Sequence, residues 1–376
     1  MLNSITIDNF KCHQHTSLAL RPLTILTGIN GYGKSSVIQV LLLLRQSHIK
    51  GLLDKGIDLN MPLVRIGIAA DARNKLSSEP TIIFSLGYGE NKQDQFVFIV
   101  EEKRMTESFI PIKEHSGDNL YPKEPLFTNQ FQYISAHRIG AQSNYDKNSY
   151  AVTQQHQISS EMGKGELVGH FLFEFQNTPM HSYTDNSEDI PLIDQVIYWE
   201  QKISPNITIT VEQTNDNTGY VIKYGYKQEG IKSLQDLRAE NIGYGISYTL
   251  PVIVAILTAQ KGDLIIIENP EAHLHPDAQL ELGNLICMAS QYGVQIIIET
   301  HSDHIINAVQ ISCKQFYETK GENGISKDNV AVHYFGQRNE PFATAVESIV
   351  IKDDGSVEYQ PKGFFDTIEK SLYQLY

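Results

Sequence analysis

The sequence predicts an α/β fold with a mainly parallel core sheet, an antiparallel β lobe and a helical insertion. An apolar run that ends in glycine, 23–27, is followed by a run of helix formers at 35–46, the order of a buried strand, a turn and a helix. Two more β-branched runs, 264–267 and 294–298, have the composition of central parallel strands covered on both faces. The polar stretch 141–190 is expected to be an insertion.

The other elements follow from local patterns in chain order. Alternation of apolar and polar side chains indicates strands, and apolar spacing close to the helical period indicates helices. These patterns predict strands at 2–9, 81–87, 95–101 and 132–136, helices at 165–175, 191–203 and 250–257, and a hairpin of 207–211 with 220–226.

The composition excludes several classes of protein. Hydrophobic residues make up 41% of the 376 residues, which is enough for a sizeable core and excludes wholesale disorder. With 44 acidic and 30 basic residues, the net charge of −14 disfavours generic binding to nucleic acid. Three cysteines without C-x-x-C spacing argue against a disulfide framework or a zinc ribbon. Neither a signal peptide nor a membrane span is visible, so we expect a soluble, cytoplasmic protein with no membrane partner.

A phosphate-binding loop is predicted between the first buried strand and the helix that follows it. Residues 28–35 match G-x-x-x-x-G-K-[ST] without a mismatch. The glycines let successive N–H groups point at phosphate oxygens, and the helix adds its positive end. Lys34 would reach the β- and γ-phosphates of ATP, and the Ser35 hydroxyl would hold Mg²⁺. The candidate nucleotide-binding residues of this loop are Asn30, Gly31, Gly33, Lys34, Ser35 and Ser36.

Polar residues follow both later β-branched runs. The first run ends in Glu268-Asn269-Pro270-Glu271, and a carboxylate at the end of a strand beside a phosphate loop is placed to hold Mg²⁺. A second carboxylate could orient the attacking water. His301 follows the second run and could touch a γ-phosphate. The alternatives are an acidic turn and a histidine with a purely structural role.

Two further patterns are weaker. A glycine-rich turn with Gly243, Gly245 and Ser247 precedes the predicted middle helix and could bind an anion, or simply cap that helix. Imidazole and carboxylate groups could also form a zinc or manganese site, although such spacings match by chance. The residues of that alternative cluster are Glu271, His273, His275, His301, Asp303 and His304.

The order of these motifs resembles that of ABC-class ATPases of the RecF/SMC/OLD type, over residues 1–50 and 240–310. The resemblance implies an ABC-ATPase-like head with a P-loop core sheet. It implies that Gly243, Gly245 and Ser247 form the signature motif, which acts across a dimer interface. It also implies that Glu268 is the Walker B metal ligand, His301 the switch histidine and Gln142 a Q-loop ligand of the metal.

The same comparison suggests four segments: an N-terminal part of the head with the β lobe (1–140), an insertion (141–235), a C-terminal part of the head (236–315) and a tail (316–376). The tail, with VAVHYFGQ and DGSVEYQPKGFFD, resembles one of unknown function on bacterial single-head ATPases.

Two departures from the family pattern bear on chemistry. Asn269 stands where relatives have a catalytic glutamate, and an amide cannot act as a general base. Hydrolysis is therefore expected to be slow, or to use Glu271 or Glu268 as base, so the catalytic candidates are Glu268, Glu271, His301 and Asn269. No D-x-D metal pair of a TOPRIM nuclease is visible after His301, so we expect no intrinsic nuclease activity.

The resemblance favours an ATPase switch that dimerises around ATP, with a higher oligomer left open. By family analogy the switch controls an effector protein, a nuclease or toxin, in anti-phage defence. Nucleic acid would then be contacted through the complex. A RecF-like repair ATPase that acts directly on DNA is the alternative, and a metal-dependent hydrolase built on the histidine cluster is a third hypothesis.

Overall fold

The predicted parallel strands lie at the centre of a six-stranded sheet. The computed structural model describes residues 1–89, 92–183, 189–228, 231–238, 242–340, 342–361 and 364. The order of strands in the sheet is β17-β16-β3-β15-β14-β8, and every neighbouring pair except β16 with β17 is parallel. Their bounds are β3 Leu23–Gly28, β8 Phe131–Ile134, β14 Leu264–Glu268, β15 Gln295–Glu299, β16 Val330–Glu340 and β17 Ala343–Ile349. The mainly parallel core sheet is therefore confirmed.

A second six-stranded sheet forms the antiparallel lobe, in the order β2-β1-β5-β6-β7-β4. Apolar side chains alternate along β1 and β5 and enter a shared core, as the sequence pattern predicted. The bounds are β1 Leu2–Phe10, β2 His13–Ala19, β4 Gly56–Asp58, β5 Thr81–Tyr88, β6 Lys92–Ile99 and β7 Phe109–Gly117. Strands β2, β4 and β7 were not predicted, because they carry few apolar residues.

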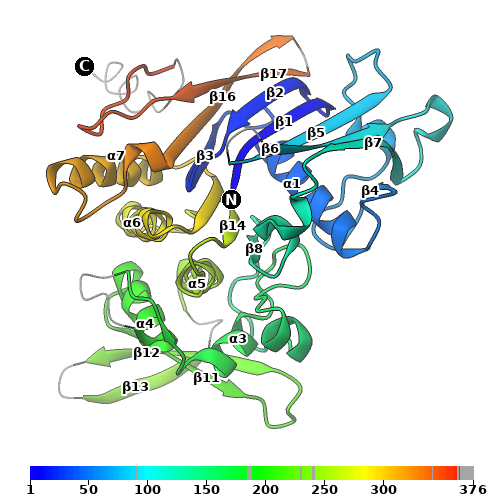
Figure 1. Cartoon of the computed structure of the whole chain (residues 1–376). Helices are drawn as coiled ribbons and strands as arrows, with labels where there is room; N and C mark the ends of the chain where they lie inside the picture. Colours follow the sequence, from blue (N-terminus) through cyan, green and yellow to red (C-terminus); the bar gives the residue numbers. More distant parts are fainter. Residues whose placement is uncertain are drawn as a thin grey trace, which may run out of the picture.

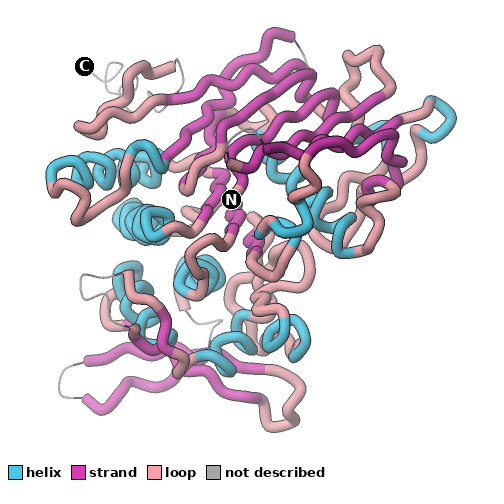
Figure 2. Tube along the Cα trace, in the orientation of Figure 1, coloured by secondary structure: helices cyan, strands magenta, loops and turns pink. Residues whose placement is uncertain are grey.

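Helices cover both faces of the core sheet (Figures 1 and 2). Side chains alternate along β14 and β15, so that Ile266 and Ile297 join the core around α1 while Ile267 and Ile298 join the core around α5 and α6. The helix bounds are α1 Lys34–Ile49, α2 Ala69–Ala72, α5 Tyr244–Leu257, α6 Pro276–Tyr292 and α7 Asp303–Glu318. The helices α6 and α7 were not predicted. No helix in the described ranges combines the length and apolar character needed to cross a bilayer.

The insertion packs below α5 at the end of the molecule opposite the C-terminal strands (Figure 1). The two predicted helices and the predicted hairpin are present, and a third strand, β13, extends the hairpin. The bounds are α3 Val168–Phe175, β9 Pro179–Met180, β10 Ile190–Pro191, α4 Leu192–Ile203, β11 Ile207–Gln213, β12 Tyr220–Gln228 and β13 Ile231–Arg238. Short 3-10 helices lie at Glu102–Arg104, Tyr121–Lys123, Pro125–Phe127 and Lys327–Asn329, and a π-helical turn at Tyr150–Gln154.

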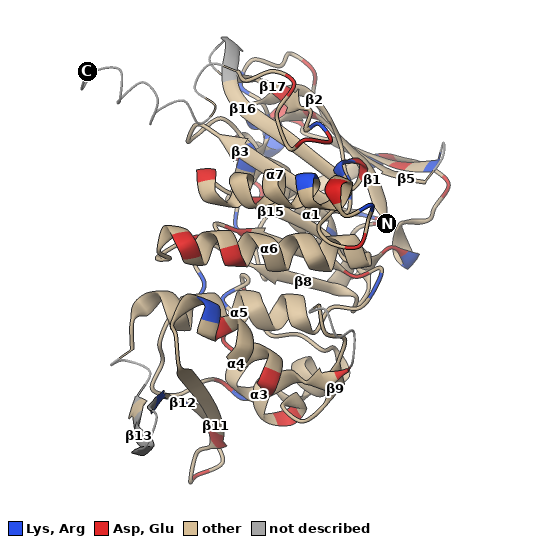
Figure 3. Cartoon of the chain, turned by 90° about the vertical axis from the view of Figure 1, so that its left-hand side faces the viewer, with Lys and Arg blue, Asp and Glu red and all other residues tan. Residues whose placement is uncertain are grey.

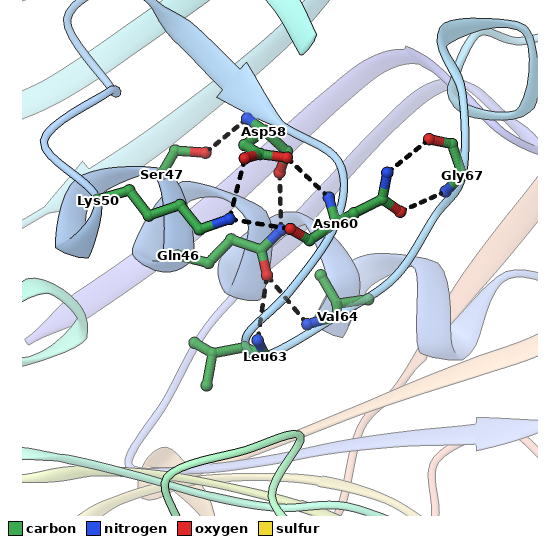
Figure 4. Close-up of polar contacts among 8 residues, drawn as sticks. All are labelled: Gln46, Ser47, Lys50, Asp58, Asn60, Leu63, Val64 and Gly67. Carbon is green, nitrogen blue, oxygen red and sulfur yellow. Dashed lines mark hydrogen bonds and ion pairs between the residues drawn. The ribbon is translucent and has the colours of Figure 1, made fainter. Parts of the chain in front are cut away.

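A buried amide fixes the C-terminal half of α1 against the segment that follows it (Figure 4). The Gln46 side chain is fully buried, donates to the Asp58 carbonyl at 2.7 Å and accepts the N–H groups of Leu63 at 3.2 Å and Val64 at 3.0 Å. Lys50 closes the same contact with an ion pair to the Asp58 carboxylate at 2.9 Å. Because a buried amide costs free energy unless it is hydrogen-bonded, this network holds α1, and with it the loop that precedes it, in one position.

Candidate active site

The phosphate loop connects the end of β3 to the start of α1. Gly28, Gly31 and Gly33 have φ values of +128°, +78° and +100°, which only glycine adopts readily. A Cβ on Gly28 would lie 2.4 Å from the Phe335 carbonyl oxygen, and one on Gly33 would lie 2.6 Å from the Cys12 sulfur. The loop is therefore curled as the motif requires, and its glycines also admit the chain of β16.

The Lys34 ammonium is turned back onto its own loop. Lys34 is 3% exposed, and its Nζ donates to the carbonyls of Gly28 and Ile29, each at 2.9 Å. Burial lowers the pKa of this ammonium, and the nearby Glu299 carboxylate partly opposes that shift. Asn30, Gly31 and Ser35 are exposed, whereas Ser36 is buried. A phosphate that enters the loop would offer Lys34 stronger acceptors than these two carbonyls.

Three carboxylates converge at the ends of β14 and β15, beside this loop. Glu268 and Glu299 are partners in the strand register. Ser35 Oγ donates to Glu299 Oε1 at 2.9 Å, and the backbone N–H of His301 donates to Glu271 Oε1 at 2.9 Å. The structure thus brings Ser35, Glu268, Glu271 and His301 together, while their roles at the nucleotide and the metal stay predictions. Glu299 was not predicted, although it ends a β-branched run in the same way as Glu268.

Burial dominates the electrostatics of this edge of the sheet. It raises the pKa values of Glu268 and Glu271, while hydrogen bonds from Ala136 N–H and His301 N–H oppose the shift. For Glu299, burial raises the pKa to about 7, with a further contribution from the neighbouring Glu268 and an opposing one from the Ser35 hydrogen bond. Burial, with the Lys34 charge, lowers the pKa of His301. A cation would offset the concentration of negative charge here.

A buried arginine clamps the turn that follows β14. The Arg138 side chain is 3% exposed, and its guanidinium carbon lies 4.1 Å from the centre of the Tyr248 ring. Among the described residues it donates to backbone carbonyls alone: those of Tyr248, Glu268 and Asn269 at 2.8 Å, Ser135 at 3.2 Å and Pro270 at 3.4 Å. Asn269 has a φ of +47° within this turn. Arg138 therefore ties α5 to the turn that carries Asn269 and Glu271; it was not a predicted site residue, because its partners leave no side-chain signature.

The glycine-rich turn lies at the start of α5. Gly243 and Tyr244 are exposed, and a Cβ on Gly245 would lie 2.6 Å from the His273 carbonyl oxygen. Ser247 is 1% exposed and donates to the Tyr244 carbonyl at 3.1 Å, one helical turn back. The Ser247 hydroxyl therefore does not point outward to bind an anion in the single protomer, because it donates its hydrogen bond within the helix. Among the residues of this turn that the structure describes, Gly243 and Tyr244 are the exposed ones.

The two remaining metal predictions, Gln142 and the histidine cluster, have different outcomes. Gln142 lines a separate polar pocket together with Asn144, Asp146 and Glu166, with no phosphate-loop residue among the lining, so its role at a metal stays a prediction. In the described part of the chain, no group of three His, Cys, Asp or Glu side chains is arranged to hold a metal ion by itself. The histidine cluster of the metal-hydrolase hypothesis is therefore wrong for these residues. His273 instead packs its ring against Tyr244 and Tyr248, with centres 4.8 and 5.0 Å apart.

Comparison with known proteins agrees with this geometry. A family model described as "AAA domain, putative AbiEii toxin, Type IV TA system" matches residues 23–307, and one described as "Protein of unknown function (DUF3696)" matches residues 325–375. The Old nuclease of Escherichia phage P2 is 24% identical over 379 residues, and the OLD nuclease of Thermus scotoductus is 25% identical over 334 residues. The alignments cover 87% and 80% of this chain but only 61% and 59% of those nucleases.

Solved structures show the same fold. A crystal structure of the Smc head bound to the C-winged helix domain of ScpA superposes with a TM-score of 0.54 at 12% identity, covering 93% of this chain and 98% of that one. An Smc head domain with an extended coiled coil, bound to the C-terminal domain of ScpA derived from Pyrococcus furiosus, gives a TM-score of 0.51 at 10% identity, covering 100% and 98%. The predicted SMC-head-like α/β fold is confirmed.

Proposed function

The chain belongs to the AAA-domain family of OLD- and SMC-like P-loop ATPases, and we propose that it is a slow ATPase that closes as a homodimer around ATP and Mg²⁺ and thereby regulates a partner effector. The observation that carries this proposal is the convergence of Lys34, Ser35 and Glu268 at the carboxyl edge of the parallel strands. A cationic loop facing buried carboxylates suits a phosphate chain with its metal.

In this proposal, Lys34 leaves the Gly28 and Ile29 carbonyls for the β- and γ-phosphates, and Ser35 and Glu268 hold Mg²⁺. This edge of the sheet fits a cation, because Glu299, the register partner of Glu268, accepts from Ser35 with one oxygen and has its other oxygen buried without a hydrogen-bond partner in the described residues. Mg²⁺ commonly takes one or two carboxylates and completes its shell with phosphate oxygens and water. When bound, it would neutralise charge that develops on the phosphates.

Glu271 is the favoured base for the slow step, with Glu268 as the second carboxylate. The His301 N–H holds one oxygen of Glu271, and the other oxygen is buried at the same edge of the sheet, where it would accept a proton from a water bound with the nucleotide. Asn269 can hydrogen-bond a water but cannot accept its proton. We expect Glu271→Gln to collapse phosphate release while ATP still binds. Asn269→Glu should accelerate release, since general bases contribute about 10²–10⁴-fold; no gain in Asn269→Glu would show that the existing carboxylates already suffice.

The proposed effector role is supported by the descriptions of the matching family and of the curated relatives. The matching family is described as a putative toxin of a type IV toxin–antitoxin system, and the curated relatives are named nucleases. We therefore propose that ATP-dependent closure controls a nuclease or toxin in anti-phage defence, with nucleic acid contacted through that complex. The alternative, direct action on DNA, is disfavoured by the net charge of −14 and by α6, which carries acidic and no basic residues on the face shown in Figure 3.

Calorimetric titration with ATP and Mg²⁺ tests the proposal. Lys34→Ala should weaken binding about 10- to 100-fold, because hydrogen bonds to charged groups contribute about 1.5–3 kcal/mol each. Lys123→Ala, at an exposed site in the β lobe, is the matched control and should bind as the wild type does. Equal affinity in Lys34→Ala, with an unchanged thermal melt, would refute the assignment of the phosphate loop. Light scattering with a slowly hydrolysed ATP analogue tests the dimer.

A further inference from the structure

Two adjacent parallel strands end in carboxylates that point to the same face of the core sheet. The strand β14 reads LIIIE and β15 reads QIIIE, and Glu268 and Glu299 are register partners. Ile267 and Ile298, one residue earlier, pack on the side of α5 and α6. Because side chains alternate along a strand, both carboxylates point to the other side, where Ser35 lies in the first turn of α1.

We propose that Glu299 is a ligand of the divalent cation in the ATP site, where it faces Ser35 and forms with Glu268 a pair of carboxylates across the ends of β15 and β14. This inference rests on the proposed function and adds to it a ligand that no motif of the family pattern assigns.

The position of Glu299 in the sheet favours it over Glu268 as the carboxylate nearer the loop. Its strand pairs directly with β3, with Glu299 opposite Leu26, whereas β14 lies one strand further away. Neighbouring strands are about 4.8 Å apart, so the backbone of Glu268 is about one strand spacing more distant from the phosphate loop. The 2.9 Å hydrogen bond from Ser35 Oγ to Glu299 Oε1 shows that the two proposed ligands already reach a common point.

The unused oxygen of Glu299 is the second observation. Glu299 is 6% exposed, and its Oε2 is buried without a hydrogen-bond partner among the residues that the structure describes. Lys34 does not satisfy it, because the Lys34 ammonium donates to the loop carbonyls instead. A buried carboxylate oxygen that lacks a donor is costly to maintain, and a cation between Glu299 and Glu268 would satisfy it while offsetting their mutual repulsion.

The protein alone offers an incomplete shell, as a nucleotide-dependent metal site should. Two carboxylates and one hydroxyl are too few for the six oxygen ligands that Mg²⁺ prefers, and phosphate oxygens with water would supply the rest. In agreement with this, the described residues contain no group of three Asp, Glu, His or Cys side chains that could hold a metal ion without the nucleotide. The metal is therefore expected to bind tightly only with ATP.

The test measures metal binding separately from nucleotide binding. Calorimetry with ATPγS in EDTA gives the metal-free affinity, and titration of Mn²⁺, followed by its electron paramagnetic resonance signal, gives the metal affinity of the nucleotide complex. Glu299→Gln should weaken Mn²⁺ binding at least tenfold and leave metal-free ATPγS binding unchanged or tighter, since a negative charge near the phosphates is lost. Glu318→Gln, at an exposed site on α7, should behave as the wild type does.

The alternatives give different results. If Glu299 merely fixes Ser35 through a hydrogen bond, Glu299→Gln will leave the Mn²⁺ affinity unchanged, because the glutamine amide oxygen still accepts from the Ser35 hydroxyl, and the proposal is overturned. Glu299→Asp provides a second measurement that keeps the charge, and should retain Mn²⁺ binding better than the glutamine variant even if both melt at a lower temperature. Failure of the wild type to bind ATPγS in either buffer would instead refute the proposed ATP site itself.

Discussion

Replacing Arg138 by methionine should separate the stability of the core from the geometry of the site. Methionine keeps a long apolar stem over the Tyr248 ring but removes every hydrogen-bond donor. Five backbone carbonyls then lose their hydrogen bond from the guanidinium. Three of these hydrogen bonds are 2.8 Å long. Two of those three carbonyls, of Glu268 and Asn269, belong to the turn that orients Glu271.

The expected loss follows from the character of these contacts. A hydrogen bond to a charged group contributes about 1.5–3 kcal/mol, but the five share one guanidinium and do not add. Leaving a buried acceptor without its donor typically costs about 1–3 kcal/mol, and three carbonyls contacted at 2.8 Å lose their donor at once. We therefore expect Arg138→Met to lower the free energy of unfolding by about 3–5 kcal/mol. Since domains are commonly stable by about 5–15 kcal/mol, the variant should remain folded and assayable at low temperature.

Urea unfolding measures this change directly, because the single tryptophan, Trp199, is buried in α4 next to α5. Arg65→Met, at an exposed site, is the matched control. We also expect the kcat for ATP to fall more than KM rises, since the turn with Glu271 loosens while the phosphate loop is untouched, and Arg138→Lys to recover part of it. A loss below about 1 kcal/mol, or an unchanged kcat, would refute the role of Arg138 as the clamp of this turn.

Two other predictions concern the dimer and a buried acid. Gly243→Arg should block ATP-dependent dimerisation in light scattering without lowering the melting temperature, because among the described residues a Cβ there meets only Ile246 Cδ1, at 3.9 Å; a dimer like that of the wild type would refute the interface. Burial raises the pKa of Glu200 well above 4.5, and neither of its oxygens has a partner in the described residues, so the folded state retains a proton that the unfolded chain releases as pH rises. Glu200→Gln should therefore stabilise the protein more at pH 8 than at pH 4, whereas exposed Glu358→Gln should give the same small effect at both; a gain that does not grow with pH would contradict the sign of this shift.

The parts of the fold that the sequence predicted are those determined by local composition. The runs that form β3, β14 and β15 are rich in apolar and β-branched residues on both faces, a pattern typical of buried parallel strands. The strand β16 could not be assigned to this sheet, because its pairing with β3 joins segments about 300 residues apart and leaves no local mark. The helix α6 begins directly after His275, within a stretch interpreted for its histidines, and its polar residues obscured the helical period.

The difference between local composition and contacts between distant segments also explains which site residues the sequence did not reveal. Glu299 ends a run that matches the run before Glu268 residue for residue in its three isoleucines and its glutamate. Local sequence therefore marks both carboxylates equally, and only the strand order decides that the second lies beside the phosphate loop. The role of Arg138 is harder to predict from the sequence, because it binds backbone carbonyls, which every residue type supplies. When several parallel strands end in acidic residues, the order of the strands in the sheet determines which acidic residue lies beside the phosphate loop. Each of these residues should therefore be tested as a metal ligand, even when a sequence motif assigns that role to one of them.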